Sequence, residues 1–291
     1  MFRGSIVALI TPFRNGAVDE KSLRDLVDWH VEEGTSAIVP VGTTGESPTL
    51  DHDEHKQVIE ITIDAVAGRV PVIAGTGSNS TAEAIEFTEH AKKAGADAAL
   101  VVTPYYNKPT QAGLYAHYKA IADAVDIPLI VYNVPSRCVV DVSVETMAKL
   151  AELPNIVGVK DSTGELDRPV LTTATCGKDF CQLTGEDAGV LAFLAHGGHG
   201  AISVTANVAP RLCAELHAAW RQGDAAGALA IHQRLMPLHK ALFVETSPAP
   251  VKYAVASLGN AEAEIRLPMV ECSEAAKLAV DRAMTSAGLI N

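Results

Sequence analysis

Short apolar segments alternate along the chain with longer segments in which apolar residues recur at helical spacing. The apolar segments are rich in Val, Ile, Leu and Ala and lack strict polar alternation, which is typical of parallel strands buried on both faces. They predict strands at residues 5–10, 37–41, 70–74, 98–103, 129–132, 156–160, 180–184 and 201–204.

The segments between these strands have the periodicity of amphipathic helices. Asp51 and Glu54 form a capping-box pattern at the start of one helix, and Gly95 suits the end of another. We expect helices at residues 19–33, 51–65, 81–94, 110–124, 143–151 and 186–195. No strand pattern follows residue 207, and helices are expected at 211–221, 225–242, 250–258 and 273–286.

Repeated β/α alternation predicts an α/β fold, a (β/α)8 TIM barrel with a C-terminal helical extension. We expect the catalytic barrel to span residues 1–223 and an α-helical subdomain to span 224–291. A doubly wound open sheet is the alternative, because local periodicity does not show whether a sheet closes.

Composition and charge narrow the class of protein. The 291 residues are 48% apolar, which supports a large core, and carry a formal net charge of −12. That charge argues against nucleic acid or an anionic membrane surface as a partner. Five scattered cysteines without a C-x-x-C pair are typical of reduced thiols. Without a signal-peptide pattern or a membrane-length apolar segment, we expect a cytoplasmic protein.

Functional side chains of a barrel gather at the carboxyl ends of its strands. Lys160 ends the strand predicted at 156–160, on one face with Gly158, which is expected to leave room beside the ammonium. Burial there disfavours the charged amine and makes it a nucleophile for a carbonyl. A strand-end lysine paired with Asp161 or Glu186 fits the same position equally well.

Three further features lie at other strand ends. Tyr132 can carry protons to a bound intermediate, and Arg137 suits a substrate carboxylate. The hydroxyls and backbone N–H groups of residues 42–45 can hold another carboxylate. Taken singly, each also fits a plainer interpretation: a half-buried tyrosine, a surface ion pair and a tight turn.

Together these segments resemble one family. Gly42-Thr43-Thr44-Gly45-Glu46, Tyr132-Asn133-Val134-Pro135-Ser136-Arg137 and Val159-Lys160-Asp161-Ser162 are similar to motifs of the dihydrodipicolinate synthase family, within the N-acetylneuraminate lyase superfamily. The motifs occur in order and at matching spacing over essentially the whole chain. The resemblance implies a homotetrameric (β/α)8 carbon–oxygen lyase, a dimer of dimers, that condenses pyruvate with L-aspartate-4-semialdehyde in lysine (diaminopimelate) biosynthesis.

The resemblance also implies a role for each site residue. Lys160 forms the Schiff base with pyruvate, and Tyr132 carries protons, relayed through Thr44 and through Tyr106, which reaches into a neighbouring subunit's site. Thr43 and Thr44 hold the pyruvate carboxylate, Arg137 holds the semialdehyde carboxylate, and the Gly185 carbonyl and Ile202 backbone line the pocket. No metal or organic cofactor is expected, because the protonated imine itself accepts the electrons.

One segment departs from the family pattern. Cys138-Val139-Val140-Asp141 follows Arg137, where the family has Thr-Gly before the residue that precedes Asp. The loss of a glycine changes the backbone angles open to this loop.

A second group of residues predicts regulation. His52 and His55 lack the spacing and third ligand of a zinc motif, so no metal site is expected. In lysine-inhibited members of the family, residues matching Ser47, His52, His55, Asn79, Glu83 and Tyr105 bind free lysine at a subunit interface. The resemblance therefore implies feedback inhibition by L-lysine, although a capped and solvated helix also fits this segment.

Two other functions are alternatives to the synthase. A pyruvate aldolase such as N-acetylneuraminate lyase or a keto-deoxy-sugar-acid aldolase uses the same lysine and tyrosine, but generally lacks the arginine in this loop. A catalytically inactive barrel kept for binding would need Lys160 or Tyr132 to be missing, and both are present.

Overall fold

The structure is a computed structural model that describes residues 1–291. Contacts divide the chain into two compact units: unit 1 comprises residues 1–3 and 72–202, and unit 2 comprises residues 4–71 and 203–291. The boundary predicted between residues 223 and 224 stays a prediction.

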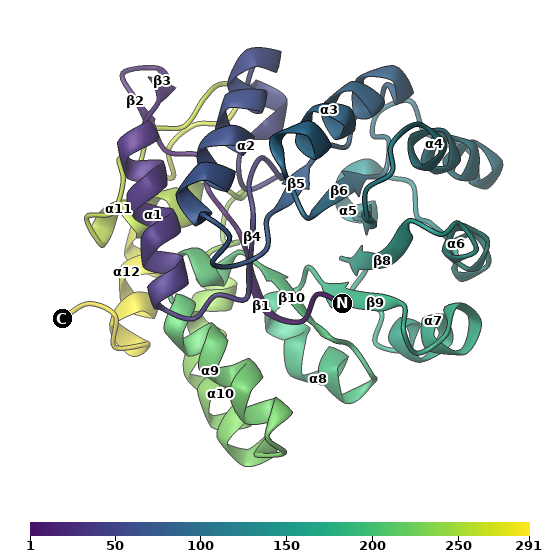
Figure 1. Cartoon of the computed structure of the whole chain (residues 1–291). Coiled ribbons are helices and arrows are strands. Elements are labelled where there is room, and N and C mark those ends of the chain that lie inside the picture. The colour runs from purple at the N-terminus through teal and green to yellow at the C-terminus, as the bar shows by residue number, and fades with distance from the viewer. The chain divides into compact units, whose positions relative to one another are not determined.

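Unit 1 contains six parallel strands, each paired with the next along the chain (Figure 1). They are β5 (Ile73–Gly75), β6 (Ala98–Val102), β7 (Leu129–Asn133), β8 (Ile156–Asp161), β9 (Cys181–Thr184) and β10 (Gly200–Ser203), of which only the last residue, Ser203, belongs to unit 2. The helices between them are α3 (Thr81–Ala94), α4 (Gln111–Ala124), α5 (Pro135–Cys138), α6 (Val144–Ala151), α7 (Arg168–Cys176) and α8 (Val190–Ala195). A doubly wound sheet reverses its strand order at a switch point. The uninterrupted order here favours the barrel.

Unit 2 contains the parallel pair β1 (Gly4–Ala8) and β4 (Ala37–Val39), with α1 (Glu20–Glu32) between them in the chain. Its other helices are α2 (His52–Val66), α9 (Pro210–Arg221), α10 (Ala225–Ala241), α11 (Ala249–Ser257) and α12 (Glu274–Ser286). Eight parallel strands with helices between them, followed by helices, confirm the predicted fold class. The capping box of Asp51 and Glu54 is formed, and Gly95 ends α3 at a φ of 101°.

A hairpin and two helices were missed by the sequence analysis. A short antiparallel hairpin joins β2 (Phe13–Arg14) to β3 (Ala17–Val18). Its turn is Asn15-Gly16, with φ of 54° and 83°, and this dipeptide is the usual signal for such a turn. The two helices are α5 and α7. In addition, β5 begins later than predicted, because Pro71 lacks the N–H that strand pairing uses.

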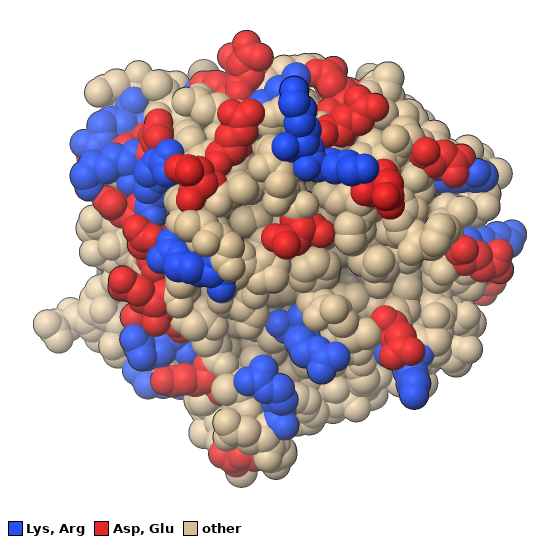
Figure 2. Space-filling model, in the orientation of Figure 1, with Lys and Arg blue, Asp and Glu red and all other residues tan.

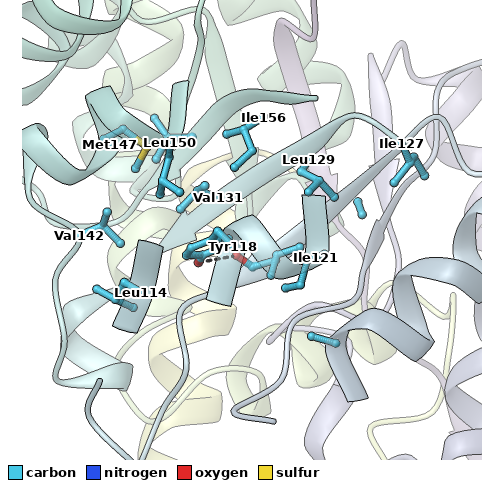
Figure 3. Packing of buried hydrophobic residues seen from close by; sticks show 14 of the residues in the cluster. Leu114, Tyr118, Ile121, Ile127, Leu129, Val131, Val142, Met147, Leu150 and Ile156 are labelled. Atoms are coloured by element: carbon cyan, nitrogen blue, oxygen red, sulfur yellow. Dashed lines mark hydrogen bonds between the residues drawn. The ribbon is translucent and has the colours of Figure 1, made fainter. Parts of the chain in front are cut away.

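A core cluster in unit 1 holds the strands that carry the candidate site (Figure 3). Leu114 and Tyr118 of α4 and Leu150 of α6 are buried together with Val131 of β7 and Ile156 of β8. The Tyr118 hydroxyl donates to the Val101 carbonyl at 3.0 Å, so its one polar atom is satisfied. Burial of such side chains contributes about 1.5–3 kcal/mol each and fixes β7 and β8.

Charged side chains of both signs are interspersed over the face seen in Figure 2, with no continuous basic surface. No helix of the structure is long and apolar enough to cross a membrane.

Candidate active site

Lys160 and Tyr132 lie side by side at the ends of two neighbouring strands. They are paired in the register of β7 and β8, and the Lys160 Nζ atom is 4.1 Å from the centre of the Tyr132 ring. Each residue is only 6% exposed. The fold thus places a buried primary amine beside a phenol, which supplies a nucleophile for a carbonyl and an adjacent proton carrier.

Asp161 is engaged elsewhere. Its carboxylate accepts a hydrogen bond from the Thr163 hydroxyl at 2.5 Å and lies 3.5 Å from the Arg168 guanidinium. The pairing of Lys160 with Asp161 that the sequence left open is therefore not formed.

Glu186, the other partner that the sequence left open for Lys160, interacts with it through charge. Burial raises the pKa of the Glu186 carboxyl and Asp187 raises it further, whereas the charge of Lys160 lowers it.

The glycine that makes room beside Lys160 is Gly185, and not Gly158 as predicted. A Cβ atom at Gly158 meets the carbonyl oxygen of Cys181 at 2.4 Å, so this glycine lets β9 approach β8. A Cβ atom at Gly185 meets Lys160 Cε at 2.9 Å and Ser162 Oγ at 1.9 Å. Pleat alternation puts Gly158 on the same face as Lys160, but only the tertiary contacts show which glycine touches it.

The other predicted site residues of unit 1 differ in exposure. Tyr106 is 92% exposed and has a φ of 72°, and Arg137 lies exposed on the short helix α5. Ile202 is buried in β10. Their roles toward substrates stay predictions.

Val139 ends α5 in a strained conformation. Its φ is 67° and its ψ is −29°, at the position where the sequence lacks the family's Thr-Gly. A β-branched residue at positive φ costs about 1–3 kcal/mol, and Val139 is 68% exposed, so its side chain gains little from burial.

We expect Val139→Gly to raise the free energy of unfolding by about 1 kcal/mol, because the strain exceeds the extra chain entropy of glycine. Val139→Ala is the matched control, since it keeps a Cβ atom at the same angle. Urea denaturation of the three chains measures the difference. An equal gain with alanine would show that the side chain, and not the backbone angle, is the source.

Thr43 and Thr44 belong to unit 2, on the loop that follows β4. The Glu46 N–H donates to the Thr43 carbonyl at 3.1 Å, so a turn is formed, and the Thr44 side chain is buried. Glu46 adopts a left-handed backbone conformation in this turn, with a φ of 55°, although it is not a glycine. The role of the two threonines toward pyruvate stays a prediction.

Glu46 anchors this loop through a buried ion pair that the sequence analysis missed. Its carboxylate accepts hydrogen bonds from the Lys252 ammonium and, at 3.0 Å, from the Arg266 backbone N–H. Lys252 also donates to the Glu264 carbonyl at 2.6 Å and lies 4.1 Å from the centre of the Phe13 ring. Burial lowers the pKa of Lys252, although Glu46 raises it. The one sign of this contact in the sequence is that Lys252 stands among the apolar residues of its helix, α11.

The residues predicted to bind lysine divide between the units. In unit 1, the Asn79 amide donates to the Tyr105 carbonyl at 3.1 Å, and Glu83 accepts from the Ser78 hydroxyl. Burial raises the pKa of the Tyr105 phenol, and the charge of Glu83 raises it further. Unit 2 contains Ser47, the exposed His52 and the buried His55. The structure therefore brings Asn79, Glu83 and Tyr105 together.

Similarity to known proteins extends over the whole chain. Residues 1–287 match the model of the dihydrodipicolinate synthetase family. The chain is 63% identical to the 4-hydroxy-tetrahydrodipicolinate synthase of Rhodospirillum centenum, with 100% of both chains covered. It is 61% identical to the enzyme of that name from Bradyrhizobium diazoefficiens, covering 100% of this chain and 98% of the relative.

Solved structures agree with this assignment. The chloride-inhibited dihydrodipicolinate synthase from Acinetobacter baumannii, complexed with pyruvate, is 48% identical, with a TM-score of 0.97 and 100% of both chains covered. The enzyme from Cyanidioschyzon merolae with lysine bound is 40% identical, with a TM-score of 0.96 and 99% of both chains covered. The fold, the strand-end lysine and tyrosine and these similarities agree, and the chain belongs to the dihydrodipicolinate synthetase family.

Proposed function

We propose that the protein is a lyase that condenses pyruvate with L-aspartate-4-semialdehyde to 4-hydroxy-tetrahydrodipicolinate, in the diaminopimelate route to lysine. The observation that carries the proposal is the position of the buried Lys160 Nζ, 4.1 Å from the centre of the Tyr132 ring. The chain that holds this pair is 61–63% identical to relatives named 4-hydroxy-tetrahydrodipicolinate synthase. The pyruvate complex of the Acinetobacter baumannii enzyme supports the choice of first substrate.

In the proposed reaction, the Lys160 amine adds to the keto carbon of pyruvate and water leaves, giving a protonated imine. Loss of a methyl proton gives an enamine, whose carbon attacks the aldehyde. The substrate's amino group then displaces Lys160 as the ring closes. Tyr132 carries the protons, with Thr44 and Tyr106 as relay. No metal or organic cofactor is needed for these steps.

The remaining residues are proposed to bind substrate. Thr43 and Thr44 hold the pyruvate carboxylate, and Arg137 holds the semialdehyde carboxylate through a planar guanidinium. Gly185 and Ile202 line the pocket, which fits the close contact between Gly185 and Lys160 Cε.

Turnover of three substrates tests this function. We expect consumption of aspartate semialdehyde with pyruvate at a kcat/KM at least about a thousandfold above that for cleavage of sialic acid or a keto-deoxy sugar acid, because only the semialdehyde brings a second carboxylate, besides that of pyruvate, for Arg137. Arg137→Ala should raise the KM for the semialdehyde. Efficient cleavage of sialic or keto-deoxy acids by the unaltered chain would favour the aldolase alternative.

We further propose L-lysine as a feedback inhibitor that binds Ser47, His52, His55, Asn79, Glu83 and Tyr105. The lysine-bound Cyanidioschyzon merolae enzyme supports this effector, as does the local cluster of Asn79, Glu83 and Tyr105. The Glu83 carboxylate suits the ammonium of a free amino acid.

Glu83→Gln is expected to raise the lysine concentration for half-inhibition at least about tenfold, because it removes a charge-assisted hydrogen bond. Glu89→Gln, an exposed residue on the same helix α3, is the control and should leave inhibition unchanged. Initial rates over a lysine titration measure both. A rate that is constant up to millimolar lysine in the unaltered chain would refute the regulatory proposal.

A cytoplasmic homotetramer, built as a dimer of dimers, completes the proposal. A 92% exposed tyrosine at position 106 fits a residue that a second subunit covers, and five cysteines without a disulfide fit a reducing compartment. Light scattering of the purified protein measures the subunit number.

A further inference from the structure

Arg168 is buried at the centre of a polar cluster that the proposed reaction does not use. It lies in the first turn of α7, and its guanidinium meets three carboxylates and one carbonyl. The Nε atom donates to Glu165 at 2.9 Å, Nη2 donates to Asp141, and Nη1 donates to the Val142 carbonyl at 3.1 Å and lies 3.5 Å from Asp161. A single guanidinium thus joins segments that are distant in the sequence.

Two members of this cluster directly follow the candidate catalytic residues: Asp161, a partner of Arg168, and Asn133, a partner of Asp141. Asp161 follows Lys160 at the end of β8, and Asn133 follows Tyr132 at the end of β7. Asn133 is fully buried, donates to the Asp141 carboxylate at 2.6 Å and accepts from the Val142 N–H at 3.0 Å. Because successive residues of a strand point to opposite faces, the cluster lies on the face of β7 and β8 opposite to Tyr132 and Lys160.

Asp141, another partner of Arg168, closes the loop that carries Arg137. This loop, residues 134–142, leaves the end of β7 and contains the strained Val139. Asp141, held by Asn133 and Arg168, ties the far end of the loop back to the end of β7 where it began. The loop is therefore fastened at both ends, and Arg168 shares the second fastening with Asn133.

We propose that Arg168 is a positioning residue that holds the Arg137 loop in place and thereby sets the affinity for the second, carboxylated substrate. The inference rests on the proposed function, in which Arg137 binds that carboxylate. Lys160 itself is held by the parallel pairing of β8 with β7 and β9 and by the core beneath it. Loss of Arg168 should therefore weaken binding of the semialdehyde and leave the formation of the pyruvate adduct intact.

An arginine is required because four acceptors surround one planar cation. The guanidinium nitrogens of Arg168 donate in three directions from a rigid plane. A lysine ammonium is a point charge and cannot reach Glu165, Asp141 and Val142 together. Arg168→Lys thus keeps the charge among the carboxylates but breaks the geometry, so this variant is a better test than removal of the charge.

The test compares Arg168→Lys with Asp141→Asn, which keeps the contact with Asn133 but removes a charge, and with the double variant. We expect each single change to raise the KM for the semialdehyde about tenfold and to alter the KM for pyruvate less than twofold. The double variant should show little more than the larger of the two single effects, because each single change already breaks the contact between Arg168 and Asp141. Arg211→Lys, an exposed arginine paired with Glu33, is the control.

Trapping of pyruvate on Lys160 by borohydride is measured in the same variants without the second substrate. Unchanged trapping together with a raised semialdehyde KM supports the proposal. Slower trapping, an equal rise of both KM values, or no change in either would overturn it, and thermal denaturation confirms that each variant is folded. Failure of the unaltered chain to consume the semialdehyde would instead refute the proposed function.

Discussion

Lys160→Arg is expected to abolish both covalent capture of pyruvate and turnover. The guanidinium stays protonated at every usable pH, so it has no free electron pair to attack a carbonyl. The charge and much of the length of the side chain are kept, which preserves the contact with the Tyr132 ring, 4.1 Å from the ammonium in the unaltered chain. We expect kcat/KM to fall at least about a thousandfold, the range seen when a nucleophile is removed.

Mass spectrometry after borohydride reduction in the presence of pyruvate measures the adduct directly. The unaltered chain should gain the mass of one reduced pyruvate on Lys160, and Lys160→Arg should gain none. Lys149→Arg, an exposed lysine near the end of α6, is the matched control and should behave like the unaltered chain. An adduct on Lys160→Arg, or none on the folded unaltered chain, would contradict a Schiff base at this residue.

The second large effect is on stability. Glu46→Gln should lower the free energy of unfolding by about 3–5 kcal/mol, because it leaves the ammonium of the 0% exposed Lys252 without a counter-charge. The melting temperature should fall by at least about 5 °C. The loop that carries Thr43 and Thr44 should also loosen, and the KM for pyruvate should rise.

A double-mutant cycle separates the contribution of the Glu46–Lys252 ion pair to the free energy of unfolding from the effects of each single substitution. Glu46→Gln with Lys252→Met removes both charges, and the combined loss should be smaller than that of Glu46→Gln alone, since no buried charge is left unpaired. Glu274→Gln, which breaks an exposed pair with Lys277, should change the stability far less, because solvent screens the pair. An equal loss of unfolding free energy in Glu46→Gln and Glu274→Gln would show that burial of the Glu46–Lys252 pair has no effect on stability.

Much of the fold could be predicted from the sequence because the signals are local. Runs of Val, Ile and Leu, such as those of β7 and β8, are the pattern of strands buried on both faces, and all eight parallel strands lie where they were predicted, within a few residues at each end. The helix caps at Asp51 and Gly95 depend only on neighbouring residues, so they too were correct. The hairpin turn at Asn15-Gly16 is equally local and was overlooked.

The candidate nucleophile was only half decided by the sequence. The position of Lys160 at a strand end allowed a nucleophile or an ion pair, and the family motifs favoured the nucleophile. The structure excludes the pair with Asp161, because Thr163 and Arg168 engage that carboxylate. It also replaces Gly158 with Gly185 as the glycine beside Lys160, since β9 and not the lysine occupies the space at Gly158.

By itself, then, the sequence determined the order of strands and helices, the strand ends that carry Lys160 and Tyr132, and the family motifs that suggest their chemistry. Only the tertiary structure decided which distant charges meet: Arg168 with Asp141 and Asp161, and Lys252 with Glu46. The physical reason is that periodicity and capping act between residues a few positions apart. A buried ion pair forms between side chains that are 206 residues apart in the case of Glu46 and Lys252, and no local pattern specifies that contact.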